Sequence, residues 1–275
     1  MIRLLVGFDS AWTAGNSGGL VGVLHTDTDG LLELGLPIAT TFEQAELQIT
    51  RWQAELGPDE TIILIDQPTI VENVTGQRPV ENLVSSPVSR RYGGMQPANT
   101  GRKGMFDADA PIWGFLHRFG GPLDPFCSGK LHSGVIETYP VLTIIAMGWI
   151  LESTRPTGRL PKYNPAHRKK FYQGDWARLC GQAAGEFRLA ALSGIAAWLD
   201  DMSKVIKPNK SDQDGLDACL CLLVGIIFST GKPCLVVGAK ESGVIIVPDE
   251  PLLRNELEVR CDQTGRNPKA WVRVV

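Results

Sequence analysis

The first twelve residues, MIRLLVGFDSAW (Met1–Trp12), decide the fold. Seven mostly apolar residues, Ile2–Phe8, run straight into one carboxylate, Asp9. Such a run predicts a strand that is buried on both faces. In open α/β sheets, ligands bind at the carboxyl ends of the strands. Asp9 is therefore either a solvated residue that closes the strand or the first residue of a site, and the choice depends on other acids reaching the same edge.

The residues after Asp9 predict an antiparallel meander followed by a helix. Two further strands, Leu20–His25 and Leu31–Leu36, are separated by the turn-forming sequence DTDG. Thr41 is followed three residues later by Gln44, which is the pattern of a capping box at a helix start. Apolar residues then recur every three or four positions until a Gly-Pro pair, which predicts the end of the helix.

Two later apolar strands also end in acids. Thr61–Ile65 is short, apolar and β-branched, and Asp66 follows it directly. Because a strand that returns through a helical crossover lies parallel to the strand it joins, pairing with the first strand would place Asp9 and Asp66 side by side. Gly134–Ile136 is a further short strand, and it ends in Glu137.

The second half of the chain predicts mainly helices. One helix face runs from Phe187 through Ala191 to Trp198. The last main helix is expected over about Gln213–Ser229, preceded by Ser211 in a position that resembles a cap. Asp217 lies in its first turns among apolar neighbours, which makes a simple capping role a poor explanation for this acid.

The stretch from residue 69 to residue 133 has little periodicity and many glycines and prolines. A loop of this length in a compact domain is usually functional or disordered. Its segment SSPVSRRYGG combines hydroxyls, guanidiniums and glycines, which suits a phosphate-gripping element. A solvated surface excursion is the alternative interpretation. We expect substrate contacts from Arg90, Arg91, Arg102 and Lys103, within a basic set that also includes Arg78, Arg118 and Lys130.

Composition limits the function classes. The chain has 275 residues, of which 43% are hydrophobic and 21% charged, as in an ordinary globular protein. A net charge of −3 excludes a uniformly basic nucleic-acid binder, but it allows a local basic face around an acidic centre. The six cysteines form no CxxC pair, which favours buried thiols over zinc or disulfides. With no leader and no apolar run long enough for a membrane span, we expect a cytoplasmic protein.

The predicted fold class is α/β, with a mixed sheet of meander and parallel strands flanked by helices. We expect one domain over residues 1–250, with residues 67–133 as a loop-rich insertion. Residues 251–275 would form a C-terminal extension packed on that domain. The order of elements and the positions of the acids look like the ribonuclease-H-like fold, which carries acids on its first strand, on the strand after its first helix and on a later helix.

Four acids stand out by position: Asp9, Asp66, Glu137 and Asp217. Carboxylates that converge at one edge repel one another and raise each other's pKa values unless cations neutralise them. Mg²⁺ or Mn²⁺ would do so, because such hard ions prefer oxygen ligands, and two of them can stabilise both the attacking and the leaving oxygen of phosphodiester cleavage. We therefore expect a metal-dependent nuclease acting on DNA or RNA. Asp214 and Asp217 could exchange roles because both lie within one helical turn.

Five short motifs, GFDSAW, IDQP, SRRYGG, ETYP and DGLDA, occur in this order along nearly the whole chain. Together they resemble the domain-of-unknown-function 429 family, whose members are described as predicted nucleases with a ribonuclease-H-like fold. The resemblance implies that the metal-binding acids are Asp9, Asp66, Glu137 and Asp217. It also implies that Arg90 and Arg91 contact the substrate.

Two other functions compete with the nuclease. Asp9 followed by Gly15, Ser17, Gly18 and Gly19 faintly resembles the first phosphate loop of sugar-kinase and actin-type enzymes. An ATP-dependent phosphotransferase or ATPase on a related core is thus one alternative, although no second acid-terminated meander is present. The other is a non-catalytic nucleic-acid-binding domain. The sequence also leaves a homo-oligomer open.

Overall fold

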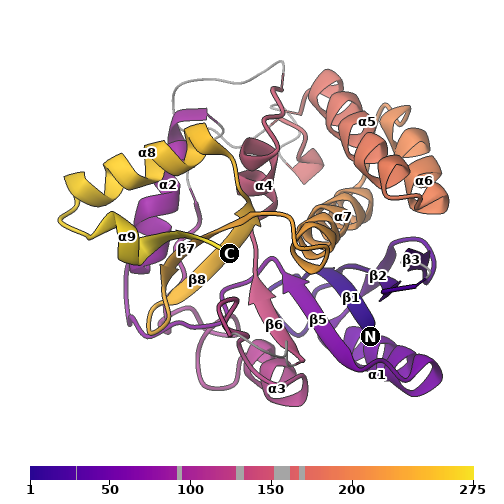
Figure 1. The fold of residues 1–275 in the computed structure, drawn as a ribbon, viewed down its shortest axis with the longest axis horizontal. Helices are drawn as coiled ribbons and strands as arrows, with labels where there is room; N and C mark the ends of the chain where they lie inside the picture. Colours follow the sequence, from indigo (N-terminus) through magenta and orange to yellow (C-terminus); the bar gives the residue numbers. More distant parts are fainter. Residues whose placement is uncertain (29, 92–94, 128–132, 152–161, 167–170) are drawn as a thin grey trace.

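A mixed sheet forms the centre of the protein in the computed structural model (Figure 1). Its strands lie in the order β3-β2-β1-β5-β6, and β4 pairs with the other end of β2. The strands are β1 (Ile2–Asp9), β2 (Gly18–Thr26), β3 (Gly30–Glu33), β4 (Ile38–Thr40), β5 (Glu60–Ile65) and β6 (Gly134–Glu137). The structure describes residues 1–28, 30–91, 95–127, 133–151, 162–166 and 171–275.

The pairing of β1 confirms the predicted combination of a meander with parallel strands. β1 is antiparallel to β2 and parallel to β5, and β5 is parallel to β6. From Leu4 to Asp9 every residue of β1 is buried, as the continuous apolar run predicts for a central strand. The chain therefore has the mixed α/β architecture expected from its sequence.

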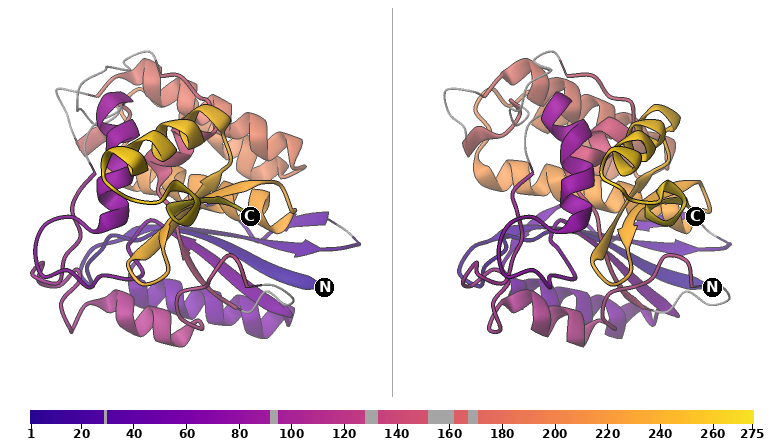
Figure 2. Two further views of the ribbon diagram at one scale, coloured as in Figure 1. Left: turned by 60° about the vertical axis from the view of Figure 1, so that its left-hand side comes forward. Right: turned by 90° about the vertical axis from the view of Figure 1, so that its left-hand side faces the viewer.

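Helices cover both faces of this sheet (Figures 1 and 2). α1 and α3 pack on one face around Phe8, Phe42 and Phe115. α7 packs on the other face, with α4, α5 and α6 on the same side. The predicted capping box at Thr41 and Gln44 is confirmed at the start of α1. These helices are α1 (Phe42–Leu56), α3 (Pro111–Arg118), α4 (Pro140–Ala146), α5 (Gln173–Leu189), α6 (Ser193–Ser203) and α7 (Lys210–Ser229).

A smaller antiparallel sheet, in the order β8-β7-β9, lies beside β6. The Thr138 hydroxyl, just after β6, donates a hydrogen bond of 2.7 Å to the carbonyl oxygen of Ile246 in β8. The C-terminal residues 251–275 supply α8, α9 and β9, and β9 pairs with β7. The remaining elements are β7 (Cys234–Ala239), β8 (Gly243–Pro248), β9 (Val272–Val274), α2 (Pro79–Arg91), α8 (Pro251–Gln263) and α9 (Pro268–Trp271).

The structure corrects three sequence-based expectations. The single helix face through Ala191 is wrong: α5 ends at Leu189, and Ala191 has a φ of 60°, a left-handed conformation that starts a new helix direction. The stretch from residue 69 to residue 133 contains two helices, α2 and α3. The N-cap of α7 is Asn209, which forms a capping box with Asp212, so Ser211 is not the cap.

Two other expectations concern cysteines and membranes. All six cysteines are free thiols; five are buried and Cys127 is exposed. Within the described residues, no helix has the length and apolar character that crossing a bilayer requires.

Candidate active site

Three acids line up at the carboxyl edge of the central sheet. Asp9 ends β1, Asp66 directly follows β5, and Glu137 ends β6. The register pairs Phe8 with Ile65 and Ile65 with Glu137, so the ends of the three parallel strands are level. The prediction that Asp9 and Asp66 emerge side by side is thereby confirmed.

Helix α7 adds two more acids to this edge because it lies unusually close to the sheet. A Cβ atom on Gly7 of β1 would overlap the carbonyl oxygen of Ala218, and one on Gly19 of β2 would overlap that of Asp214. Only glycine permits such contact between a strand and the helix backbone. The close approach brings Asp214 and Asp217, from the first turns of α7, next to Asp9.

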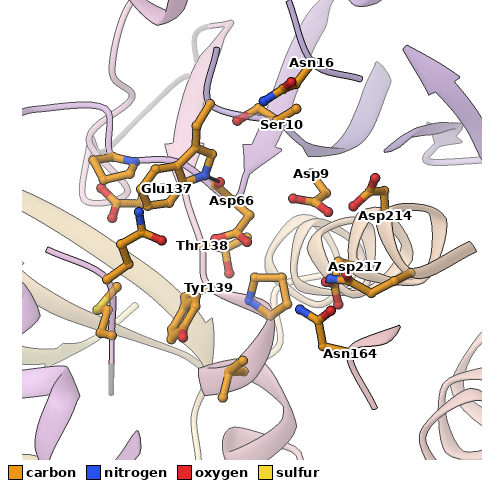
Figure 3. Close-up of a pocket in the computed structure, with 18 of the residues that line it drawn as sticks. Asp9, Ser10, Asn16, Asp66, Glu137, Thr138, Tyr139, Asn164, Asp214 and Asp217 are labelled. Atoms are coloured by element: carbon orange, nitrogen blue, oxygen red, sulfur yellow. Dashed lines mark hydrogen bonds between the residues drawn. The ribbon is translucent and has the colours of Figure 1, made fainter. Parts of the chain in front are cut away.

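The five acids line one open cavity of about 820 Å³. Figure 3 shows the carboxylates of Asp9 and Asp214 facing each other, with Asp66 and Asp217 around the same space. Among the described residues, six carboxylates and one ammonium line this cavity. The sixth carboxylate is that of Glu81 in α2, and the ammonium is that of Lys210 at the start of α7.

Burial and mutual repulsion disfavour the ionised form of these carboxylates and so raise their pKa values. Burial, followed by the charges of Asp217 and Asp66, raises the pKa of Asp9 well above its usual value. Removal from bulk water and the charges of Asp217 and Glu137 do the same to the pKa of Asp66. Burial raises the pKa of Asp217 to about 6, although Lys210 and two hydrogen bonds oppose the shift. The cluster therefore has too little positive charge nearby to stabilise all of its carboxylates in the ionised form.

Asp217 and Asp214 have partners that sequence reasoning did not find. The Tyr163 hydroxyl donates a hydrogen bond of 3.0 Å to Oδ1 of Asp217, and Nε2 of Gln213 donates to its Oδ2. Nζ of Lys210 donates to Oδ1 of Asp214. The spacing of four residues within each α7 pair is a local signal that could have revealed Gln213 and Lys210. Tyr163 is 54 residues from Asp217, so no local pattern points to it.

Glu137 lies in a different environment from the other acids. Its Oε1 accepts a hydrogen bond of 2.5 Å from Nη2 of Arg78, and its Oε2 accepts one of 2.9 Å from Nη1. Nε of Arg78 donates to Glu81 at 2.7 Å, and the guanidinium is buried between the two carboxylates. Arg78, expected among the basic residues of a surface loop, is instead the centre of an internal ion-pair triad.

The expected substrate contacts occupy varied positions. Arg90 and Arg91 are the last two residues of α2, but their side chains lie outside the described part of the structure. Gln96 is an exposed residue of the cavity lining. With its carboxamide turned so that the oxygen faces Arg102, that oxygen accepts from the Arg102 guanidinium at 2.5 and 3.0 Å. Lys103 is exposed, and neither it nor Arg102 belongs to the described lining of the cavity.

The donor set is suited to a hard cation, although the carboxylates do not converge on a single point. Asp9 and Asp217 offer carboxylate oxygens at one edge, with exposed fractions of only 7% and 4%. Within the described residues, no cationic side chain forms an ion pair with Asp9, Asp66 or Asp217. In that same part of the chain, no three His, Cys, Asp or Glu side chains are already positioned as a metal-binding group. Binding would require the carboxylates to move towards a shared ion.

Comparison with known proteins gives one result. A family model described as "Protein of unknown function (DUF429)" matches residues 7–241, which include every acid of the cavity. No curated protein and no solved structure matches the chain.

Proposed function

The chain belongs to the DUF429 family, a family of unknown function, so its activity has to be argued from its own site; we propose that it is a metal-dependent nuclease. The observation that carries this proposal is the cluster of Asp9, Asp66, Asp214 and Asp217 in one open cavity, with raised pKa values and a single ammonium among its described lining residues. A cluster of this kind is a candidate for function because buried charges without partners destabilise a fold.

The proposed cofactor is Mg²⁺ or Mn²⁺, held by Asp9, Asp66 and Asp217. Bound there, such ions would supply Lewis-acid stabilisation of the attacking and leaving oxygens of a phosphodiester. Tyr163 and Gln213 orient the Asp217 carboxylate by donating to both of its oxygens. Burial and the nearby Asp217 raise the pKa of Tyr163, so its hydroxyl keeps the proton that this contact needs.

Lys210 and Glu137 would act around this centre. The Lys210 ammonium binds Asp214 and is attracted by Asp9, so it compensates part of the negative charge before any cation arrives. Glu137 belongs to the Arg78 triad. We propose that its main role is to fix the end of β6 beside Asp66, and that metal binding is a minor role for this residue. Arg102 would contact substrate phosphates beyond the cavity rim.

The fold supports the same proposal. We propose that the central sheet is of the ribonuclease-H-like type. Its first three strands form a meander, and β1 lies between β2 and β5. Asp9 ends β1, Asp66 follows β5, and Asp214 and Asp217 lie in the first turns of α7. This is the pattern expected of the ribonuclease-H-like fold, which carries acids on its first strand, on the strand after its first helix and on a later helix.

A cleavage assay tests the proposal. End-labelled single-stranded and duplex DNA and RNA are incubated with the protein in Mn²⁺ or in EDTA, and the products are separated by size. We expect cleavage in Mn²⁺ alone. Asp9→Asn should reduce the rate about 100-fold or more, on the scale of losing one preorganised electrostatic contact, with an unchanged circular dichroism spectrum.

The matched control is Asp262→Asn, which removes an exposed carboxylate from α8 and should cleave at the wild-type rate. Cleavage by Asp9→Asn at the wild-type rate would overturn the assignment. Consumption of ATP with all nucleic acids intact would favour the phosphotransferase instead.

A further inference from the structure

Part of the cavity lining is apolar, and we call this part the apolar wall. It is formed by Trp12, Pro68, Met95, Met105, Pro140 and Val141. A cavity of about 820 Å³ is within the size range of sites that enclose a small organic ligand. The cavity therefore has room for an aromatic ring against its apolar lining. A phosphate group of the same ligand would be held through metal ions bound by the carboxylates.

Trp12 is held rigidly in this wall. Its indole N–H donates a hydrogen bond of 2.8 Å to the carbonyl oxygen of Asp66, and its ring meets the buried ring of Phe106 edge-on at a centroid distance of 5.4 Å. Its φ is 62°, a left-handed conformation that is rare for a bulky residue and recurs at functional sites. Because the side chain is only half-buried, a fixed aromatic surface remains next to a proposed metal ligand.

Polar side chains that can form hydrogen bonds with the edge of a heteroaromatic ring line the same cavity. Asn16 and Asn164 are in its lining, and each carboxamide offers both donors and an acceptor. Figure 3 places Asn164 beside Asp217, and Asn16 beside Ser10 on the turn that follows β1. A heteroaromatic ring with mixed donors and acceptors matches this surrounding better than an aliphatic chain does.

We propose that this wall binds one unpaired nucleobase, stacked on Trp12, so that the substrate is single-stranded nucleic acid or a strand with an extruded base. The inference rests on the proposed nuclease function and names its substrate class. Every nucleobase has a π-face, so stacking on an indole binds single strands without requiring one sequence. A base that remains paired in a duplex cannot present its face to the indole, and extruding it costs binding energy.

The test measures binding separately from cleavage. A labelled 12-nucleotide single strand, the same strand with abasic positions, and its duplex are titrated with protein by fluorescence anisotropy. Ca²⁺ replaces Mn²⁺ as a hard, oxygen-liganded cation, and a gel verifies strand length afterwards. We expect the base-bearing single strand to bind about 10-fold or more tightly than the abasic strand and the duplex, as expected for one stacked base.

Two variants isolate the aromatic face. Trp12→Leu keeps an apolar side chain but has no ring, and it should bind the base-bearing strand about 10-fold more weakly, with no remaining difference from the abasic strand. Trp12→Phe keeps a ring and should retain most of that difference. Because both variants lose the indole N–H, their comparison separates stacking from the contact with Asp66.

The outcomes distinguish this inference from the proposed function. Equal binding of abasic and base-bearing strands, wild-type binding by Trp12→Leu, or no binding of any strand would overturn the base pocket. Base-dependent binding that Trp12→Leu abolishes, in a protein that cleaves no strand in Mn²⁺, would support the pocket and overturn the nuclease.

Discussion

Two groups of acids line one cavity, and they differ in how their charge is balanced. In the Arg78 triad, Glu81 and Glu137 share a guanidinium that is 1% exposed and donates to both carboxylates. In the acid cluster of Asp9, Asp66, Asp214 and Asp217, Lys210 pairs with Asp214 alone among the described residues. The carboxylates of the first group both form ion pairs with Arg78, whereas most carboxylates of the second group have no ion-pair partner among the described residues.

The difference separates a structural role from a functional one. Both groups bury carboxylates at the end of the central sheet, so burial alone does not identify a site. In the triad, attraction to Glu137 and Glu81 outweighs burial and raises the pKa of Arg78, so the guanidinium stays charged. In the acid cluster, burial and repulsion raise the pKa values of Asp9 and Asp66. A binding partner with positive charge would resolve this second imbalance.

Breaking the triad should have the largest effect on stability. Arg78→Met leaves Glu81 and Glu137 buried without their counter-charge, which should lower the free energy of unfolding by about 3–5 kcal/mol. Urea denaturation monitored by circular dichroism measures this loss. Arg188→Met is the matched control, because Arg188 and its partner Asp200 are 59% and 44% exposed and should contribute no more than about 1 kcal/mol. Equal losses in the two variants would show that the triad is not a structural anchor.

Neutralising one member of the acid cluster should act in the opposite direction. Asp217→Asn removes a charge whose pKa burial raises to about 6. Its amide oxygen can still accept from Tyr163, but its amide N–H replaces the oxygen that accepts from Gln213, and that lost contact offsets part of the gain. We expect the metal-free variant to be more stable than the wild type at pH 8, by up to about 3 kcal/mol. Thermal unfolding in EDTA measures the gain, and Asp262→Asn should show none. A loss of stability in Asp217→Asn would mean that this charge is already compensated.

The pH dependence should show a smaller effect of the same origin. Because the folded pKa of Asp217 lies above its unfolded value, the folded state binds more protons between about pH 4 and pH 6. Stability of the metal-free protein should therefore decrease as pH rises through this window and level off above the folded pKa values. Asp217→Asn should have a shallower slope, measurable as the midpoint of urea unfolding at several pH values. Identical slopes in the two proteins would contradict the shift.

Sequence pattern was sufficient for the elements that carry the acids. Apolar runs that end in Asp9, Asp66 and Glu137 are local signals, and the helical crossover predicted the parallel pairing that aligns the first two. The packing of α7 was harder to predict from the sequence. It depends on Gly7 and Gly19, and only the folded structure shows that the α7 backbone contacts these two glycines.

The partners of the acids required the structure. Arg78 is separated by 59 residues from Glu137, and in sequence it looked like any other basic residue of a glycine- and proline-rich stretch. That stretch also hides α2, because Pro87 lies inside the helix and masks its pattern. The same sequence pattern, an apolar strand that ends in a carboxylate, therefore occurs at Asp9, which has no ion-pair partner among the described residues, and at Glu137, which pairs with Arg78. Only long-range contacts distinguish the two.

Calorimetric titration with Mn²⁺ at pH 8 tests most directly whether the acid cluster is the cation site. We expect the wild type and Asp262→Asn to bind Mn²⁺ with equal affinity and stoichiometry, and Asp9→Asn to lose that binding while its circular dichroism spectrum is unchanged. At pH 5 wild-type binding should be weaker, because protons compete for carboxylates whose pKa values are raised. Wild-type affinity in Asp9→Asn, or no binding by the wild type, would contradict the assignment of the acid cluster as a metal site.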